Sequence, residues 1–403
     1  MKETCSSFST NAARSSGPES LIVDRISHFD FQPRTRLIFG AGSLERVGAL
    51  AAELGSKRAL LVTDKGIAAA GHPACAVGFL EAAGVQVSIY DEVRENPTTK
   101  DVDRCVEVAR AAEIDLLIGL GGGSSMDTAK GCNFLLTNGG VMKDYWGVGK
   151  ATRAMLPLIA IPTTAGTGSE CQSFALISDE ETHQKMACGD AKAAAKVAIL
   201  DPVLTISQPP RVTAYTGIDA LAHAVETAVT KKRNALSAMY SREAFRLCIG
   251  SLEQAMSEPQ NLETRGMMQL GAAFAGTAIE NSMLGATHAA ANPLTAHFGV
   301  VHGLAVGVML PAVIAFNARD PRSHQRYLEL AAAAELGGVD ELIAEVETLL
   351  GVARMREDLL KYSVDRNLIP TLAKEAASQW TAGFNPREIT AVDFETLYEE
   401  VLG

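Results

Sequence analysis

The sequence predicts two parts, an α/β domain built on a parallel sheet followed by an all-helical C-terminal domain. From about Thr35 to Asp201, short apolar runs alternate with longer Ala-rich stretches of helical spacing. Such alternation is typical of parallel strands joined by crossover helices. After Gln208-Pro209-Pro210 the helical spacing continues to Gly403 with almost no strand alternation. We therefore expect a polar tail at 1–27, the α/β domain at 28–208 and the helical domain at 209–403.

Composition excludes several classes of protein. The 403 residues allow two or three domains, and 36 Lys+Arg against 47 Asp+Glu give a net charge of −11, which argues against nucleic-acid and anionic-membrane partners. The longest apolar stretch, 300–316, contains His302 and Pro311 and is shorter than a membrane-spanning helix requires. No secretory signal is expected in the first 27 residues, and the seven Cys lack a CxxC pair. Free thiols and a cytoplasmic location are predicted.

Six apolar runs bounded by Gly, Asp or Pro predict strands buried on both faces: Thr35–Phe39, Arg58–Thr63, Val85–Tyr90, Ile114–Leu120, Leu156–Ile161 and Val197–Leu200. Helices are expected between some of them, at Gly66–Ala83 and Thr98–Ala112. Long amphipathic segments predict helices in the second domain, at Leu236–Ala255, Leu262–Ile279 and Asp340–Leu350.

A glycine-rich loop follows the fourth predicted strand. The segment from Gly119 to Asp127 reads GLGGGSSMD and opens a helix. Glycines in this position let backbone N–H groups approach a pyrophosphate at the helix N-terminus. The loop is neither G-x-G-x-x-G, because Ser124 replaces the last Gly, nor a Walker A loop. A plain tight turn is the alternative, but three consecutive glycines favour phosphate binding and a dinucleotide-binding, Rossmann-like domain.

Other strand ends carry polar side chains. Asp64 ends the second strand, where it could accept both ribose hydroxyls of an adenosine or simply cap the next helix. Asn96 lies in a turn before Pro97, and Thr163 and Thr167 belong to a hydroxyl-rich loop that could cap a helix or line a cofactor. Lys185 lies in a polar stretch of the kind usually found on the surface.

A carboxylate and three imidazoles form a candidate metal site. Asp219 and His223 are four residues apart and so point from one helix face. His288 and His302 follow, 14 residues apart, among Ala, Gly and Leu. Together these groups suit a divalent ion with room for a substrate oxygen. Each His alone could equally be a core or capping residue, and spacing does not show that the four meet. His297 could line the site or be structural.

With these residues considered, the chain resembles the iron-dependent (group III) alcohol dehydrogenase family from about Phe31 to the C-terminus. The resemblance rests on VTDKG (Val62–Gly66), ENPTT (Glu95–Thr99), GLGGGSSMDTAK (Gly119–Lys130), IPTTAGTGSE (Ile161–Glu170), TGIDALAHAVE (Thr216–Glu226) and VHGLAVGVMLPAVIAFN (Val301–Asn317).

The resemblance implies a cofactor in the cleft between the two domains and assigns roles by position. Asp64 falls on the acid that holds the adenosine ribose and favours NAD over NADP. The other implied cofactor contacts are Asn96, Gly122, Gly123, Ser124, Asp127, Thr163 and Thr167, with Leu176 and Lys185 near the nicotinamide. Asp219, His223, His288 and His302 fall on the ligands of Fe²⁺, and such a site would also accept Zn²⁺.

The resemblance further implies reversible hydride transfer between NAD(H) and a small alcohol, aldehyde or ketone, in a homodimer or larger homo-oligomer. A polyol (glycerol-type) dehydrogenase or a dehydroquinate-synthase-like enzyme is the alternative. Many family members carry a second His one turn after the third ligand, where this chain has Asn292. Because Asn does not titrate, either water and ribose hydroxyls carry the proton, or His297 helps, or the substrate differs.

Overall fold

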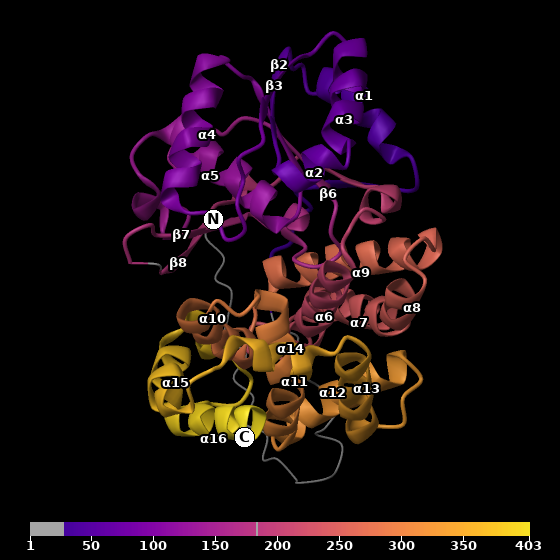
Figure 1. Ribbon diagram of the computed structural model, residues 1–403, viewed down its shortest axis with the longest axis vertical. Coiled ribbons are helices and arrows are strands. Elements are labelled where there is room, and N and C mark those ends of the chain that lie inside the picture. Colours follow the sequence, from indigo (N-terminus) through magenta and orange to yellow (C-terminus); the bar gives the residue numbers. More distant parts are fainter. Residues whose placement is uncertain (1–27, 183) are drawn as a thin grey trace, which may run out of the picture.

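The structure is a computed structural model that describes residues 28–182 and 184–403, and the predicted tail at 1–27 lies outside the described residues. An α/β part and a helical part stack along the long axis (Figure 1). The α/β part contains a parallel sheet in the order β1-β9-β6-β4-β2-β3. Its strands are β1 (Arg36–Phe39), β2 (Arg58–Val62), β3 (Gln86–Tyr90), β4 (Leu116–Gly121), β6 (Leu158–Pro162) and β9 (Val197–Leu200). All six strands were predicted, each to within two residues at either end.

Helices cover both faces of this sheet: α1 (Val47–Glu53), α2 (Lys65–Ala69), α3 (His72–Ala82), α4 (Thr99–Ala111) and α5 (Gly123–Asn138). Side chains alternate between the faces, so Leu60 joins the core under α4 and α5 while Leu61 joins the core under α1 and α3. The single helix expected at Gly66–Ala83 is two helices, because Gly71 between them adopts φ +84° and ends the first.

A second, small sheet was not predicted. It contains β5 (Gly147–Val148), β8 (Lys185–Gly189) and β7 (Phe174–Ser178), with β7 and β8 antiparallel. Lys185, whose polar surroundings are of a kind usually found on the surface, begins β8, and its side chain lines a cavity. The strands on either side of the polar β7–β8 turn are too short to show an alternating pattern of apolar and polar residues.

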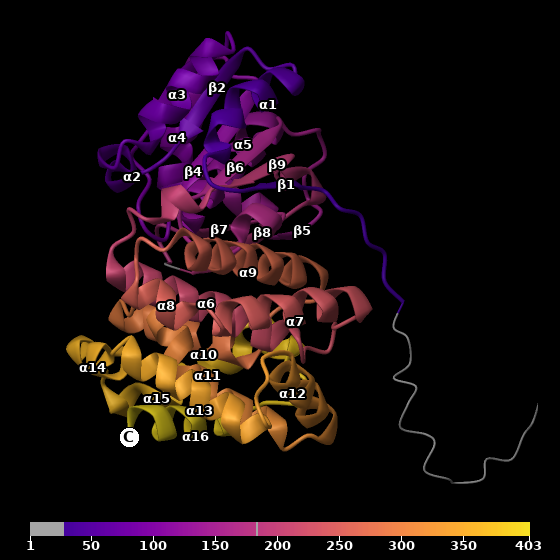
Figure 2. The ribbon, with the colours of Figure 1, turned by 90° about the vertical axis from the view of Figure 1, so that its right-hand side faces the viewer.

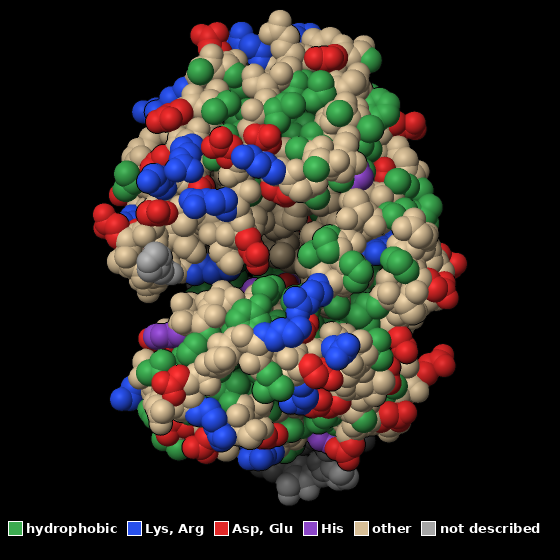
Figure 3. Space-filling view, in the orientation of Figure 1, with side chains coloured by type: hydrophobic (Ala, Val, Ile, Leu, Met, Phe, Trp, Pro, Cys, Tyr) green, Lys and Arg blue, Asp and Glu red, His purple; other side chains and the backbone are tan. Residues whose placement is uncertain are grey.

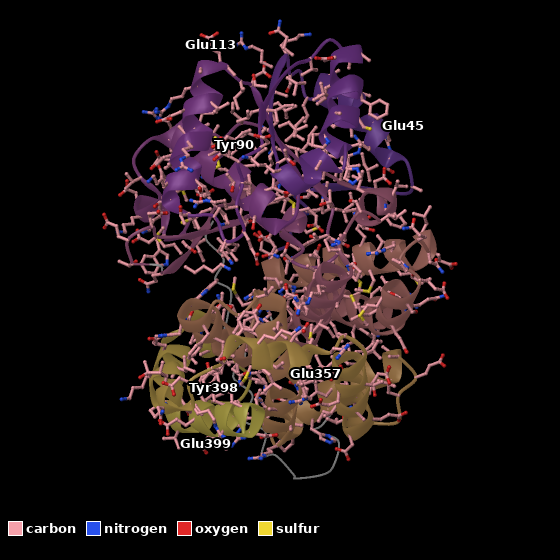
Figure 4. All side chains as sticks on the ribbon, viewed as in Figure 1. Glu45, Tyr90, Glu113, Glu357, Tyr398 and Glu399 are labelled. Atoms are coloured by element: carbon pink, nitrogen blue, oxygen red, sulfur yellow. The ribbon has the colours of Figure 1, made fainter. Side chains whose placement is uncertain are left out.

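The second part is helical, as predicted: α6 (Pro210–Thr227), α7 (Ala235–Ile249), α8 (Leu252–Ser257), α9 (Leu262–Asn281), α10 (Ala286–Phe298), α11 (His302–Ala318), α12 (Pro321–Ala333), α13 (Val339–Val352), α14 (Met355–Leu359), α15 (Ile369–Ser378) and α16 (Ala391–Leu402). The longest apolar run forms α11, which is buried almost throughout. Tyr398 points inward from α16 and donates to the Ala290 carbonyl at 2.6 Å (Figure 4). Among the described residues, no helix is long and apolar enough to cross a membrane.

Helix α9 lies directly against the α/β part (Figure 2). Gly168, after β6, adopts φ +61°, and a Cβ there would lie 2.6 Å from the Cα of Gly276 on α9. Only glycines allow this approach, which fixes the loop after β6 at the junction of the two parts.

Candidate functional site

A cavity of about 650 Å³ lies between the two parts, where the surface is hollowed (Figure 3). It runs from the carboxyl ends of β2 and β4 to the helices α6, α10 and α11. This is where open α/β sheets bind ligands. The lining includes every predicted cofactor and metal residue: Asp64, Asn96, Gly122, Gly123, Ser124, Asp127, Thr163, Thr167, Leu176, Lys185, Asp219, His223, His288 and His302.

The glycine loop presents the N-terminus of α5 to the cavity. Gly121 has φ +149°, and Gly122 is the N-cap of this 16-residue helix. A Cβ on Gly123 would lie 2.8 Å from Cγ2 of Thr167, so the two loops touch here without room for a side chain. Free backbone N–H groups and the helix dipole make this end of the cavity suitable for a phosphate.

Asp64 caps a helix and also faces the cavity. Its Oδ1 accepts from the Ile67 N–H at 3.0 Å and caps α2. The side chain also lines the cavity. A carboxylate has two oxygens, so a second acceptor remains for a ligand hydroxyl.

Asp127 belongs to a buried polar network that the sequence did not reveal. Its Oδ1 accepts from Ser169 Oγ at 2.7 Å, and its Oδ2 accepts from the Leu176 N–H at 3.3 Å. The fully buried Lys130 donates to the carbonyls of Ser169 at 2.7 Å and Phe174 at 2.9 Å. Burial raises the pKa of Asp127, and Lys130 opposes that rise. The network therefore ties α5 to β7.

Lys185 faces the cavity beside two acids. Its Nζ donates to Oδ1 of Asn96 at 3.3 Å. Burial lowers the pKa of this ammonium group, while Asp127 and Asp219 act to raise it. Asn96 itself adopts φ 52°, which directs the turn toward β8.

Three of the four candidate ligands meet at one point, and the fourth, His223, lies beside Asp219. Ligand atoms of Asp219, His288 and His302 all lie within 4.8 Å of one another. From Oδ1 of Asp219, the Nε2 atoms lie at 3.5 Å (His223), 3.4 Å (His288) and 3.9 Å (His302). Ligands about 2.1 Å from a tetrahedral ion are separated by about 3.4 Å, so the spacing fits one ion. Oδ1 of Asp219 and Nε2 of His288 are buried with no hydrogen-bond partner among the described residues.

Glu226, which the sequence analysis did not single out, orients one of these ligands. Its Oε2 is hydrogen-bonded to Nδ1 of His288, and its Oε1 accepts from the Thr287 N–H at 2.7 Å. Although burial lowers the pKa of His288, Glu226 and Asp219 outweigh it and raise that pKa to about 9. A carboxylate on the far ring nitrogen of a metal-binding His is a common arrangement. Glu226 follows Asp219 by seven residues and so lies on the same face of α6. This spacing is the sequence signal that could have identified Glu226.

Glycines let the ligand helices approach one another. A Cβ on Gly303, next to His302, would lie 2.3 Å from the Tyr215 carbonyl of α6. A Cβ on Gly285, the N-cap of α10, would lie 3.1 Å from Oε1 of Glu226. The first contact packs α11 against α6, and the second places the N-terminus of α10 in contact with Glu226.

His297, which could assist proton transfer, and Asn292, at the position of the second His of many relatives, lie outside the cavity lining. Asn292 donates from Nδ2 to Oε1 of Gln379 at 3.2 Å, and Nε2 of His297 lies 2.9 Å from Oε2 of Glu375. Neither belongs to the cavity lining. The structure thus does not bring His297 to the candidate site, because its position near the end of α10 points it toward α15.

Comparison with known proteins identifies the family. Residues 33–202 match the model of "Iron-containing alcohol dehydrogenase", and residues 213–402 match that of "Fe-containing alcohol dehydrogenase family, C-terminal". The chain belongs to the iron-containing alcohol dehydrogenase family. This confirms the predicted fold and the predicted NAD-dependent oxidoreductase acting on CH–OH groups.

Individual relatives match over most of their length. Alcohol dehydrogenase 4 of Schizosaccharomyces pombe is 33% identical over 91% of this chain and 87% of its own. The solved structure of a 1,3-propanediol oxidoreductase has a TM-score of 0.89 at 30% identity, covering 93% of this chain and 100% of that one. Sulfoacetaldehyde reductase from Bifidobacterium kashiwanohense, solved with NAD⁺, has a TM-score of 0.85 at 29% identity, covering 93% and 99%.

Proposed function

We propose that this alcohol dehydrogenase holds Fe²⁺, or Zn²⁺ in its place, through Asp219, His223, His288 and His302, and that NAD(H) occupies the rest of the cavity. The observation that carries the proposal is the convergence of Asp219, His288 and His302 from three helices, with His223 Nε2 3.5 Å from Asp219 and with unpartnered ligand atoms on Asp219 and His288. When bound, the ion supplies Lewis acidity to the oxygen of an alcohol or aldehyde.

The chain's own residues then orient the reactants. The N-terminus of α5 holds the pyrophosphate, and Asp64 accepts the adenosine ribose hydroxyls and repels a 2′-phosphate. Leu176 and Lys185, which line the cavity on the side of β7 and β8, would contact the nicotinamide half of the cofactor. Glu226 keeps the proton of His288 on Nδ1, leaving Nε2 free as a ligand.

Proton transfer does not require a second His. Lys185 carries a titratable nitrogen on the cavity wall, and burial lowers the pKa of its ammonium group. The side chain of His302 is 25% exposed, so water reaches this end of the cavity. We propose that Lys185 Nζ and this water exchange the proton of the substrate hydroxyl. A phosphorylated, dehydroquinate-like substrate fits less well, because Arg94 and Lys185 are the two Lys or Arg residues on the described lining.

Metal removal tests the proposal. Enzyme from which a chelator has removed the metal should no longer form NADH from small primary alcohols. Its activity should return when Fe²⁺ or Zn²⁺ is added back. Undiminished turnover by enzyme shown by elemental analysis to contain no metal would contradict it.

We also propose a cytoplasmic homodimer or larger homo-oligomer. The six described cysteines are free, as expected in a reducing compartment. The edge strand β1 leaves Leu37 37% and Phe39 46% exposed, an apolar edge that a second copy would cover. Light scattering after size exclusion should give at least twice the chain mass, and a monomer would contradict this.

A further inference from the structure

An aromatic contact joins the two parts of the molecule beside the cavity. Phe174 of β7 lines the cavity, and its ring centroid lies 6.1 Å from that of Trp380. Trp380 belongs to the 3-10 helix Trp380–Phe384 of the helical part and is 45% exposed. Trp380 does not itself line the cavity but contacts Phe174, which does. A large, half-exposed aromatic side chain that contacts a lining residue of the opposite domain suggests a contact that serves a ligand as well as the fold.

Backbone and side-chain contacts hold both rings in place. Gly189 lies opposite Phe174 in the β7–β8 ladder, and a Cβ there would lie 2.3 Å from Cε1 of the ring. On the other side, Gln379 precedes Trp380 and accepts the hydrogen bond from Asn292 at 3.2 Å. Asn292, the position at which the chain departs from many relatives, therefore anchors the segment that carries Trp380.

The neighbouring cavity wall is apolar, and both cations on the lining already have a partner. Apolar lining residues come from β7, from the end of α9 and from the approaches to the two His-bearing helices: Leu176, Ile279, Leu284 and Val301. Of the two Lys or Arg residues on the lining, Arg94 is ion-paired with Asp101 at 2.6 Å, and Lys185 is hydrogen-bonded to Asn96. A charged substrate tail against the apolar residues would lose its hydration, and an anionic tail would have to compete with Asn96 for Lys185.

We infer that Phe174 and Trp380 form a specificity wall that selects primary alcohols and aldehydes with an uncharged, apolar chain, and that Asn292 positions this wall through Gln379. The inference rests on the proposed function, in which the carbinol carbon gives a hydride to NAD⁺, the hydroxyl proton passes to water, and the products are aldehyde and NADH. Aromatic faces also attract quaternary ammonium groups, so a cationic substrate is the competing outcome of the test.

Three alcohols that share a HO–CH₂–CH₂ unit and differ in the charge of a bulky head group test the class directly. They are 3,3-dimethylbutan-1-ol (neutral), choline (cationic) and isethionate (anionic), each oxidised by the metal-loaded enzyme with NAD⁺. We expect kcat/KM for the neutral alcohol to exceed both others at least ~10-fold. Equal or faster oxidation of choline or isethionate would overturn the inference while leaving the proposed function intact. Absence of NADH formation from these alcohols and from ethanol and 1-propanol would count against both.

Variants test the residues. Phe174→Ala and Trp380→Ala should each lower kcat/KM for 3,3-dimethylbutan-1-ol ~10-fold, mainly through KM, without changing the KM for NAD⁺. Trp380→Phe should restore most of the loss, and Asn292→Ala should shift KM in the same direction by less. Trp146→Ala is the matched control, because Trp146 is 42% exposed, much like Trp380, but only Trp380 has a ring contact with the lining residue Phe174 among the described residues. The same KM in Phe174→Ala, Trp380→Ala and Trp146→Ala would overturn the assignment.

Fluorescence provides a readout that does not depend on turnover. The chain has two tryptophans, so Trp146→Ala leaves Trp380 as the single emitter. We expect 3,3-dimethylbutan-1-ol to change Trp380 emission saturably and isethionate not to. An unchanged emission up to 3,3-dimethylbutan-1-ol concentrations that saturate turnover, or an equal response to isethionate, would contradict the inference even in a protein whose catalysis failed.

Discussion

The two ends of the cavity are suited to bind their ligands with different chemical groups, the backbone at one end and side chains at the other. At the α5 end, the groups that face a ligand are largely backbone: Gly122, Gly123 and Ser124 open the helix and present N–H donors. At the α6 end they are side chains, with Asp219, His288 and His302 converging from three helices within 4.8 Å. Backbone donors tolerate a change of side chain provided that no atom enters the space, whereas a side-chain ligand has no substitute. The two ends should therefore respond very differently to mutation.

The largest effect is expected at the side-chain end. Asp219→Ala removes the oxygen that all three His nitrogens face and should lower turnover on the order of 10³-fold, with loss of bound metal. Elemental analysis and NADH absorbance measure the two effects. Asp340→Ala, at an exposed carboxylate of α13, is the control and should retain both. Metal retention in folded Asp219→Ala would refute the ligand assignment.

Glu226→Gln should have the next largest effect at the same end. The amide oxygen can still accept from the Thr287 N–H, but the charge that orients His288 is lost. We expect metal affinity to fall roughly 10–100-fold, measured by competition with a chelator. An unchanged affinity would mean that Glu226 only supports the fold.

Gly123→Ala tests the backbone end. The new Cβ would lie 2.8 Å from Thr167 Cγ2, so the loop must shift and its N–H groups with it. We expect NAD⁺ to bind ~10-fold more weakly, by titration calorimetry, while metal content stays normal. Ser124→Ala keeps the backbone and should cost less than about 3-fold. If Ser124→Ala proved the more damaging, the contrast between the two ends would fail.

The same contrast explains how much of the molecule could be predicted from its sequence. The six strands and the loop at Gly122 depend on short-range signals: an apolar run, its bounding glycines and a following helix. Asp64 also belongs here, since a strand end and a cap lie within four residues of one another. These features were located to within two residues because the sequence signals that predict them are local, although the strands pair with distant strands.

Contacts between distant residues could not be predicted in this way. The sequence showed two pairs of candidate ligands, Asp219 with His223 and His288 with His302. It did not show that His302 lies beside Asp219, because that depends on the close contact between Gly303 and the Tyr215 carbonyl, 88 residues apart in the chain. Lys185 and Phe174 reach the cavity through a small sheet whose strands are too short to show periodicity. The place of His297 depended on which side of α10 meets α15, which no local pattern shows.

Asp64→Asn should give a smaller change, confined to the choice of nucleotide. Asn caps a helix as well as Asp, so α2 keeps its N-cap while the charge is removed. We expect kcat/KM for NADP⁺ to rise several-fold relative to NAD⁺, because the repulsion of the 2′-phosphate is lost. Initial rates with both nucleotides measure the ratio. An unchanged ratio would show that this carboxylate serves α2 alone.

The smallest effect is expected for His297→Ala. This variant tests whether a residue that is close to the candidate ligands in the sequence, but distant from them in the fold, contributes to catalysis. His297 lies between two candidate ligands in the chain, but its Nε2 is bound to Glu375 at the surface, 2.9 Å from Oε2, with 31% of its side chain exposed. Losing this exposed pair should cost no more than about 1 kcal/mol of stability. We expect kcat within about 2-fold of the parent and an unaltered pH profile, because the proposed proton route runs through Lys185 and cavity water, away from His297. A tenfold loss of kcat or a displaced acid limb of the profile would place His297 in proton transfer, and the route by Lys185 and water would then be wrong.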